Sequence, residues 1–395
     1  MRSFIFILTC ICFSATIAVA QPYQIGHLSA TFTDTARSSR SVPVEIYYPA
    51  DITGDNVPFA AALSGKVPAI SFGHGFVMTY DAYANIKDAV VAEGYIIAFP
   101  TTEGSLSPSH SEFGKDLAFV LKKVAELGST SGSVLFNKVD TGNCVMGHSM
   151  GGGAAHLAMT FDPSIKAIAT LAAAETTPSA TTAATSVTAP ALVFAGENDC
   201  VSPPATNQLL MYTALSAACK HYIKIKGGSH CQMAGTSITC SFGESTCTPA
   251  PTITRAAQHA TINKYLIPWL NYTLKGNCTD GSTFETALST DAAVTYSKNC
   301  TLCGTASLQH AGSNNTVAIY PNPCTDKIIF ALPEDVTATV HIYSATGSAV
   351  HQTTGRSNTT ISTQKYAPGI YFYQITAPHS LQSVRGYFIV NGHDQ

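Results

Sequence analysis

GNCVMGHSMGGGAAHLAM, residues 142–159, joins two different local patterns. Residues 144–146 are apolar, as at the end of a buried strand, and the Ala-rich residues after 153 are typical of a helix. The turn between them holds Ser149, with a glycine two positions away on either side. This G-x-S-x-G pattern is typical of a nucleophile elbow, in which glycines permit a strained turn that raises a serine above a sheet. The alternative is a turn that only packs a helix against a strand.

A serine hydroxyl is a weak nucleophile until a base takes its proton, so an elbow of this kind needs a histidine and an acid. Residues 189–204 contain an apolar strand followed by Asp199, and residues 220–235 contain the next strand followed by His230. The carboxyl ends of parallel strands meet at one edge of a sheet, so we expect both residues to converge on Ser149. Glu197 follows the same strand as Asp199 and is the rival acid.

The loop at residues 73–76, GHGF, provides a second donor for an oxyanion. Its glycines let the backbone turn, so that the amide of Phe76 can face the pocket beside the amide of Met150. The alternative is a Gly-rich turn with a purely structural role. We expect His148, like His74 and His156, to support or pack around the site rather than act as the base. The predicted substrate pocket consists of Gly75, Phe76, His148, Met150 and Ala174.

Short apolar runs alternate with helical patterns from about residue 26 to 275, which predicts an α/β fold with a mostly parallel sheet flanked by helices. One amphipathic helix is expected at 111–128. The stretch between the strands that end at 171 and begin at 191 is too short for a cap domain. Seven strands are predicted: 44–48, 67–72, 95–99, 143–146, 167–171, 191–195 and 222–226.

The two ends of the chain lack the alternation of strand and helix patterns seen in the α/β region. Residues 1–20 have a basic start, an apolar stretch and a small-residue cleavage site, and predict a secretory signal peptide. The catalytic domain is then expected at 21–303, followed by a polar linker at 304–317. Period-two alternation and turn clusters predict a small all-β sandwich at 318–395, with strands at 327–332, 336–343, 369–376 and 384–390.

The composition of the chain limits the kinds of molecule that it is expected to bind. The chain has a net charge of -3 and only 11% charged residues, which argues against nucleic acid and favours a neutral or apolar partner. Ten of the twelve cysteines lie beyond the predicted signal, and export favours disulfides. Cys300 and Cys303 form a C-x-x-C for which disulfides are a better interpretation than a metal site, and Cys144 fits a small core residue. We expect no metal and no cofactor.

GHGF, GHSMGGG, GENDCVSPP and GGSH, in this order, resemble the serine α/β-hydrolases of the dienelactone hydrolase and cutinase-like polyester (PET) hydrolase group over residues 26–275. The resemblance implies Ser149 as nucleophile, Asp199 as acid and His230 as base, with no cofactor. It also suggests a disulfide between Cys200 and Cys231, although their offsets differ from the family's. The place where well-studied polyester hydrolases carry a substrate-stacking tryptophan is here Ala174, and the only tryptophan, Trp269, lies far along the chain.

YPNP at 320–323, GIYFYQI at 369–375 and GYFIV at 386–390 resemble the C-terminal sorting domain of the type IX secretion system. The resemblance implies the type IX machinery as partner and a secreted or surface-attached protein. The alternative is a β-sandwich that binds carbohydrate or polymer.

The sequence therefore predicts an extracellular, monomeric ester hydrolase of the cutinase or polyesterase type. Small-ester carboxylesterase and lipase activities are the nearest alternatives. A peptidase or thioesterase uses the same triad, but no feature of the sequence supplies a clamp for a peptide amine. A non-catalytic surface binding protein is the remaining alternative.

Overall fold

The computed structural model describes residues 23–303, 318–332, 337–376 and 384–392. The predicted signal peptide and linker lie outside these ranges. The chain divides into two compact units, Met1–Cys303 and Gly304–Gln395.

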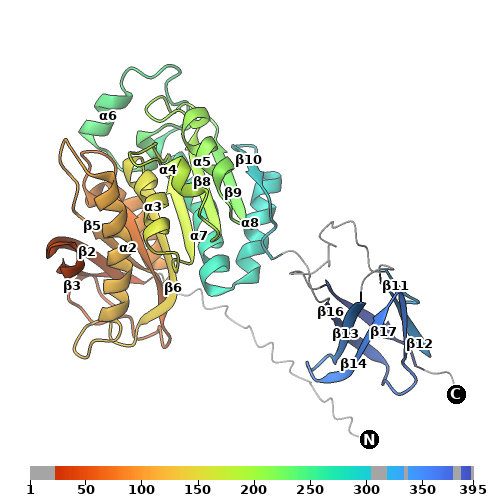
Figure 1. The fold of residues 1–395 in the computed structure, drawn as a ribbon. Coiled ribbons are helices and arrows are strands. Elements are labelled where there is room, and N and C mark those ends of the chain that lie inside the picture. The colour runs from red at the N-terminus through yellow and green to blue at the C-terminus, as the bar shows by residue number, and fades with distance from the viewer. Residues whose placement is uncertain (1–22, 304–317, 333–336, 377–383, 393–395) are drawn as a thin grey trace, which may run out of the picture. The chain divides into compact units, whose positions relative to one another are not determined.

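The first unit is built on a ten-stranded sheet with the order β10-β9-β8-β7-β6-β4-β5-β2-β1-β3 (Figure 1). Strands β4 to β9 run parallel to one another, whereas β1, β2 and β10 pair antiparallel with their neighbours. The strands are β1 (Gln24–Asp34), β2 (Arg40–Ala50), β3 (Gly54–Asp55), β4 (Val67–Gly73), β5 (Ile96–Pro100), β6 (Val139–His148), β7 (Ala167–Leu171), β8 (Ala191–Gly196), β9 (Lys220–Ile225) and β10 (Val294–Lys298).

All seven predicted strands are present, and burial explains why the sequence revealed them. Every residue of β4, β5, β7 and β8 is buried, because helices cover both faces of the parallel part of the sheet. Strands β1, β3 and β10 were not predicted, and they lie at or near the two edges of the sheet. Edge strands carry mixed polar and apolar residues, so their apolar signal is weaker.

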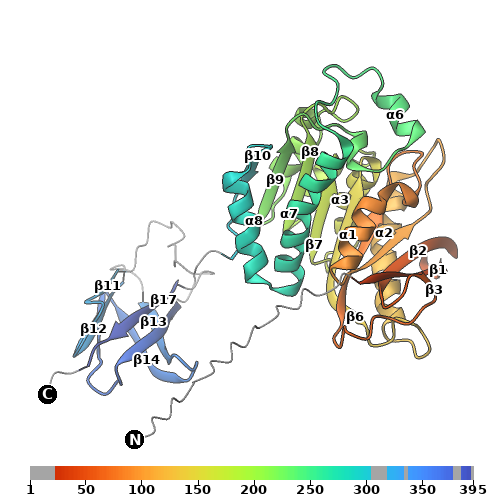
Figure 2. The ribbon, with the colours of Figure 1, turned by 180° about the vertical axis from the view of Figure 1, so that it is seen from behind.

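Helices lie on both faces of this sheet. Helices α2 to α5 pack on the face seen in Figure 1, and α1, α7 and α8 cover the face seen in Figure 2. The predicted amphipathic helix is α2, which begins after a Ser109 cap and ends at Gly128. The helices are α1 (Ala84–Ala92), α2 (His110–Leu127), α3 (Met150–Phe161), α4 (Ala180–Ala184), α5 (Gln208–Ala214), α6 (Ile238–Glu244), α7 (Arg255–Lys275) and α8 (Cys278–Thr290), with 3-10 turns η1 (Thr35–Arg37), η2 (Tyr80–Tyr83), η3 (Pro204–Thr206) and η4 (Cys231–Met233).

Two connections matter for the site. The segment 172–190 between β7 and β8 contains only the five-residue helix α4, so it forms no cap domain. Helix α6 has no buried residue and projects beyond the layers of the sheet (Figure 1). Within the described part of the chain, no helix is both long and apolar enough to cross a membrane.

The second unit is a small β-sandwich of two antiparallel sheets, one with the order β11-β12-β15 and one with β14-β13-β16-β17. Alternate residues of β13 are buried, namely Ala338, Val340 and Ile342, and they pack with Phe330 and Phe388 in one core. The four predicted strands are present, except that Val336 lies outside the described residues. The strands are β11 (Ala318–Tyr320), β12 (Lys327–Ala331), β13 (Thr337–Ser344), β14 (Ala349–Arg356), β15 (Asn358–Ser362), β16 (Gly369–Thr376) and β17 (Val384–Val390).

Candidate active site

Ser149 lies at the carboxyl end of the sheet, by which we mean the edge formed by the carboxyl ends of β4 to β9. Strand β6 ends at His148, α3 begins at Met150, and Ser149 between them has a φ of 55°. A non-glycine residue rarely adopts this left-handed backbone, which is typical of a nucleophile elbow. A Cβ on Gly151 would lie 2.1 Å from the carbonyl oxygen of Gly73, so only glycine lets α3 approach the loop after β4.

Asp199 and His230 meet Ser149 at this end. The Nε2 atom of His230 lies 2.9 Å from Oγ of Ser149, and its Nδ1 lies 2.8 Å from Oδ2 of Asp199. The second carboxylate oxygen of Asp199 accepts a hydrogen bond from the amide of Ser202 at 2.7 Å. All three are buried, with exposed fractions of 8% for Ser149, 4% for Asp199 and 2% for His230. The geometry is that of a nucleophile, a base and an acid that orients the base.

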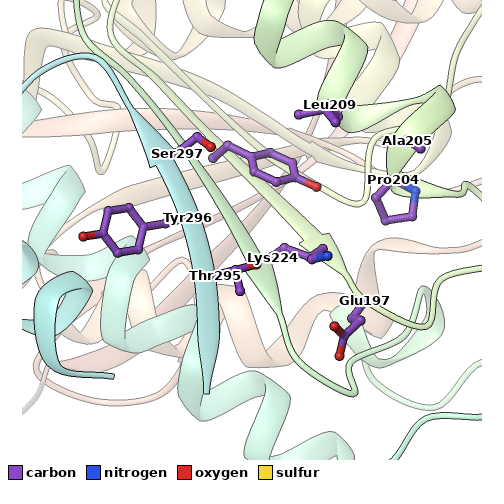
Figure 3. Close-up of a pocket in the computed structure, with 9 residues that line it drawn as sticks. Glu197, Pro204, Ala205, Leu209, Lys224, Thr295, Tyr296 and Ser297 are labelled. Carbon is purple, nitrogen blue, oxygen red and sulfur yellow. The ribbon is translucent and has the colours of Figure 1, made fainter. Parts of the chain in front are cut away.

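Glu197, the rival acid, faces elsewhere. Its side chain is exposed, and its Oε2 accepts a hydrogen bond from the amide of Gly227 at 2.9 Å. It lines a cavity of about 450 Å³ between β9, β10 and η3, together with residues such as Pro204, Lys224 and Tyr296 (Figure 3). None of the three residues of the triad geometry is among those that line this cavity. The carboxylate that contacts the imidazole is therefore that of Asp199.

His148 connects His230 to the loop after β4. Its Nε2 lies 3.2 Å from the carbonyl oxygen of His230, and its Nδ1 lies 3.0 Å from the hydroxyl of Tyr83. The same hydroxyl accepts a hydrogen bond from the amide of Gly75 at 2.7 Å. Burial, followed by the charge of His230, holds the pKa of His148 well below its usual value. A neutral ring can donate from Nε2 to the carbonyl and accept from the Tyr83 hydroxyl at Nδ1, so the contacts form one continuous chain.

The other two histidines pack as expected. His74 contacts the carbonyl oxygens of Gly75 and Thr102, both at 2.9 Å. His156 in α3 contacts the carbonyl oxygen of Gly152 at 3.0 Å, and burial lowers its pKa to about 4.

The predicted pocket residues differ in how exposed their side chains are. Phe76 is 48% exposed at the end of the loop after β4, and the amide of Ala174 donates to the carbonyl oxygen of Ser149 at 2.9 Å. The side chains of Met150 and His148 are buried, with Met150 in the core beneath the elbow. The predicted substrate pocket therefore stays a prediction, because burial does not separate Met150 from site residues such as Ser149 and His230, which are also buried.

The disulfide suggested between Cys200 and Cys231 is not formed. Cys200 pairs with Cys247, and Cys231 pairs with Cys240, because the segment between β9 and α7 brings its own cysteines to the site. Both cysteines of the C-x-x-C are in disulfides, in the pairs Cys219–Cys300 and Cys278–Cys303. The even set of ten is not fully paired, since Cys144 and Cys324 are buried and free. Cys144 packs in the core as expected.

One group of described side chains has the spacing of metal ligands. Cys219, His221 and Cys300 offer atoms that lie within 4.8 Å of one another. Cys219 and Cys300 are joined in a disulfide, however, and the metal ligand is a thiolate. These residues do not fit a metal in the oxidised protein.

Residues 18–245 match the family described as PET hydrolase-like. The chain belongs to the PET hydrolase-like family. This PET hydrolase-like chain is accordingly a hydrolase with an α/β-hydrolase fold, and the matched region contains Ser149, Asp199 and His230.

The second unit matches a different family. Residues 318–390 match the family described as a secretion system C-terminal sorting domain. The PET hydrolase-like chain is therefore an extracellular or cell-surface hydrolase that the type IX secretion machinery handles through its C-terminal domain.

Two residues near the site were not predicted from the sequence. Tyr83 follows the GHGF loop by seven residues, and nothing in its local pattern indicates that its hydroxyl reaches the elbow. Gln258 in α7 is fully buried and holds the backbone of Ser229 at both polar groups, accepting from its amide at 2.9 Å and donating to its carbonyl at 2.8 Å. The sequence does contain one indication of this role. Gln258 lies among apolar residues of a long helical stretch, and a buried side-chain amide needs hydrogen-bond partners.

Proposed function

We propose that this chain is an extracellular serine ester hydrolase that works through an acyl-enzyme. The observation that carries the proposal is the pair of contacts at His230, 2.9 Å to Ser149 and 2.8 Å to Asp199, in a strained elbow at the carboxyl end of the sheet. A hydroxyl held against a buried, oriented imidazole is the arrangement that acyl transfer requires.

The reaction follows from these positions. His230 takes the proton of Ser149 as its oxygen attacks the ester carbonyl carbon. The amides of Phe76 and Met150 hold the oxyanion of the tetrahedral intermediate. Collapse of the intermediate expels the alcohol, which takes the proton from His230, and a water activated by His230 then hydrolyses the acyl-enzyme. Asp199 fixes the tautomer of His230 and stabilises the imidazolium.

The open site favours bulky esters. The short 172–190 segment forms no cap over Ser149, and the partly exposed Phe76 offers an apolar contact beside it. Polymeric esters, including aromatic polyesters such as PET, are the substrates that we propose. The buried Trp269 supplies no stacking surface, and Ala174 beside the nucleophile is small, so recognition here depends on Phe76 more than on a second aromatic ring.

The direct test is turnover of p-nitrophenyl butyrate by the wild-type protein and by Ser149→Ala. We expect the variant to lose on the order of 10⁴-fold or more in kcat/KM. Equal rates would remove the enzyme proposal and favour a binding protein on a hydrolase scaffold. Product analysis by mass spectrometry on triglycerides, aliphatic polyesters and an aromatic polyester then separates a lipase or small-ester esterase from a polyesterase.

Export is tested separately. We propose that residues 318–395 are needed for passage across the outer membrane and are dispensable for catalysis. Deleting them should leave the protein inside a type IX-competent host while the purified hydrolase unit keeps its turnover. Unchanged export of the truncated protein would contradict this role.

A further inference from the structure

The most exposed large apolar side chains of the hydrolase unit gather at the end of the sheet that holds the triad. Among the described residues of this unit, Ile238 is 87% exposed, Phe242 is 83% exposed and Leu106 is 80% exposed. Ile238 and Phe242 lie in α6 after β9, and Leu106 lies in the loop after β5. We call these three residues the apolar rim. Exposed apolar patches on a soluble protein mark interaction sites.

The two side chains in α6 share one face of the helix. They are four residues apart, the spacing that places side chains one above the other. Helix α6 buries none of its residues, so packing against the hydrolase core does not account for its apolar face. That face has no partner within the described residues of the hydrolase unit.

Helix α6 is nevertheless fixed in place beside the triad. The disulfide Cys231–Cys240 ties it to the residue that follows His230, and the hydroxyl of Thr239 donates to the carbonyl oxygen of Val77 at 3.1 Å. Val77 follows Phe76 directly. The helix therefore contacts the loop that carries the proposed oxyanion donor and is linked to the segment that carries the base.

A second disulfide anchors the chain that follows helix α6. The disulfide Cys200–Cys247 joins the end of the α6 segment to the residue after Asp199. The two covalent crosslinks therefore join the α6 segment to the residues that follow the proposed acid and the proposed base.

The charge of this segment indicates what it meets. Residues 231–254 contain one charged side chain, Glu244, whose carboxylate accepts a hydrogen bond from the amide of Cys231 at 3.0 Å. A segment with its only charge turned inward and its apolar side chains turned outward suits a neutral, water-excluding partner. The surface of an anionic membrane or a nucleic acid would call for cations that this segment lacks.

We infer that the apolar rim docks the protein on the surface of a neutral, water-insoluble polyester, so that ester groups of the polymer lie beside Ser149. This inference rests on the proposed ester hydrolase function and deepens it, because it assigns the contact with the solid to residues outside the triad. Helix α6 then contacts the polymer surface next to Phe76.

The test measures adsorption rather than hydrolysis. Ser149→Ala serves as the background, and binding isotherms are recorded on amorphous PET film and on aliphatic polyester particles. Ile238→Ser with Phe242→Ser removes the α6 contacts, and Leu106→Ser removes the other side of the rim. Ile52→Ser with Phe136→Ser is the matched control, because these side chains are 60% and 41% exposed but lie at the opposite end of the sheet.

We expect the α6 double variant to adsorb at least about tenfold more weakly, since each large apolar side chain contributes on that order when buried. The control variant should stay within about twofold, and thermal unfolding midpoints should be unchanged in both. Equal adsorption of the α6 variant and the background would overturn the inference, as would equal losses in variant and control. Loss of self-association in gel filtration, or of binding to neutral lipid vesicles, without loss of adsorption to polyester would assign the rim to another occupant.

The two proposals fail in different ways. Equal ester turnover in the wild-type protein and in Ser149→Ala would contradict the proposed function and leave the isotherms intact. Full turnover with no effect of the rim on adsorption would contradict only the docking role.

Discussion

The two ends of the parallel sheet are built from the same buried strands and differ in almost everything that follows them. At the carboxyl end, Ser149 holds a strained backbone and three buried polar side chains meet. At the amino end, Phe161 is partly exposed but lies under the ammonium of Lys115, 5.5 Å from the ring centroid. One end carries the residues that we propose to be catalytic, and the other carries a contact that we assign to packing alone.

Each end carries two disulfides, which makes the comparison more informative. Cys200–Cys247 and Cys231–Cys240 lie at the carboxyl end, and Cys219–Cys300 and Cys278–Cys303 lie at the amino end. Crosslinking alone therefore does not distinguish the ends. The difference is that the crosslinked Cys200 and Cys231 directly follow Asp199 and His230, the proposed acid and base, and it can be tested by matched substitutions at the two ends.

The largest effect should come from the acid. Asp199→Asn leaves the shape of the site but removes the charge that orients His230, and we predict a loss of about 10⁴-fold in kcat. Glu197→Gln changes the neighbouring acid that contacts Gly227 instead, and it should keep wild-type kinetics within a few-fold. Steady-state kinetics on a soluble ester check both. The assignment fails if Glu197→Gln is the more damaging change.

The disulfides separate stability from activity. Cys278→Ser with Cys303→Ser opens a 25-residue separation at the amino end, which should cost about 3.5 kcal/mol in free energy of unfolding and leave kcat/KM within about twofold. Cys231→Ser with Cys240→Ser opens a separation of 9 residues and should cost less, about 2.5 kcal/mol, yet lower kcat/KM several-fold because Cys231 follows His230. Denaturant unfolding and ester kinetics measure the two quantities. A rate loss for the amino-end pair alone would break the comparison.

Acid should destabilise the fold through the buried histidines near the nucleophile. Burial lowers the pKa of His156 to about 4, against the nearby charge of Glu175, which raises it. Between pH 6.5 and 4 the unfolded chain binds the extra proton, so the free energy of unfolding falls as the pH falls, by up to about 3 kcal/mol for this residue. His148 acts in the same direction.

Urea unfolding of the wild type and His156→Gln at pH 7 and pH 4.5 isolates this effect. The variant should lose less stability between the two pH values, because glutamine does not titrate. Identical losses would show that His156 does not contribute.

A smaller effect is expected from the chain of contacts behind the site. Tyr83→Phe removes the hydroxyl that joins Gly75 to His148, and we predict a loss of about tenfold in kcat/KM. Tyr95→Phe is the matched control at the amino end, where the lost hydroxyl donates to Asn271 at 2.8 Å. Both variants should lose similar stability, and only Tyr83→Phe should lose rate. A rate loss in both would show that the effect is general loosening.

The meeting of Ser149, Asp199 and His230 could be predicted from the sequence because each of these residues follows the end of a strand. Asp199 and His230 each follow a continuous apolar run, and a parallel sheet brings such positions to one edge whatever the intervening loops do. Disulfide pairs depend instead on loop paths, so the link suggested between Cys200 and Cys231 was wrong. The hydroxyl of Tyr83 reaches the elbow through a 3-10 turn whose direction no periodicity encodes.

We propose that the carboxyl end of the sheet makes one hydroxyl, that of Ser149, a strong nucleophile. The most direct measurement is reaction of the full protein with a p-nitrophenyl phosphonate ester, followed by intact mass and peptide mapping. We predict one added phosphonyl group per chain, on Ser149, with loss of ester turnover in proportion to labelling and no labelling in Ser149→Ala. Label on a different residue, or full turnover in protein labelled at Ser149, would contradict the claim.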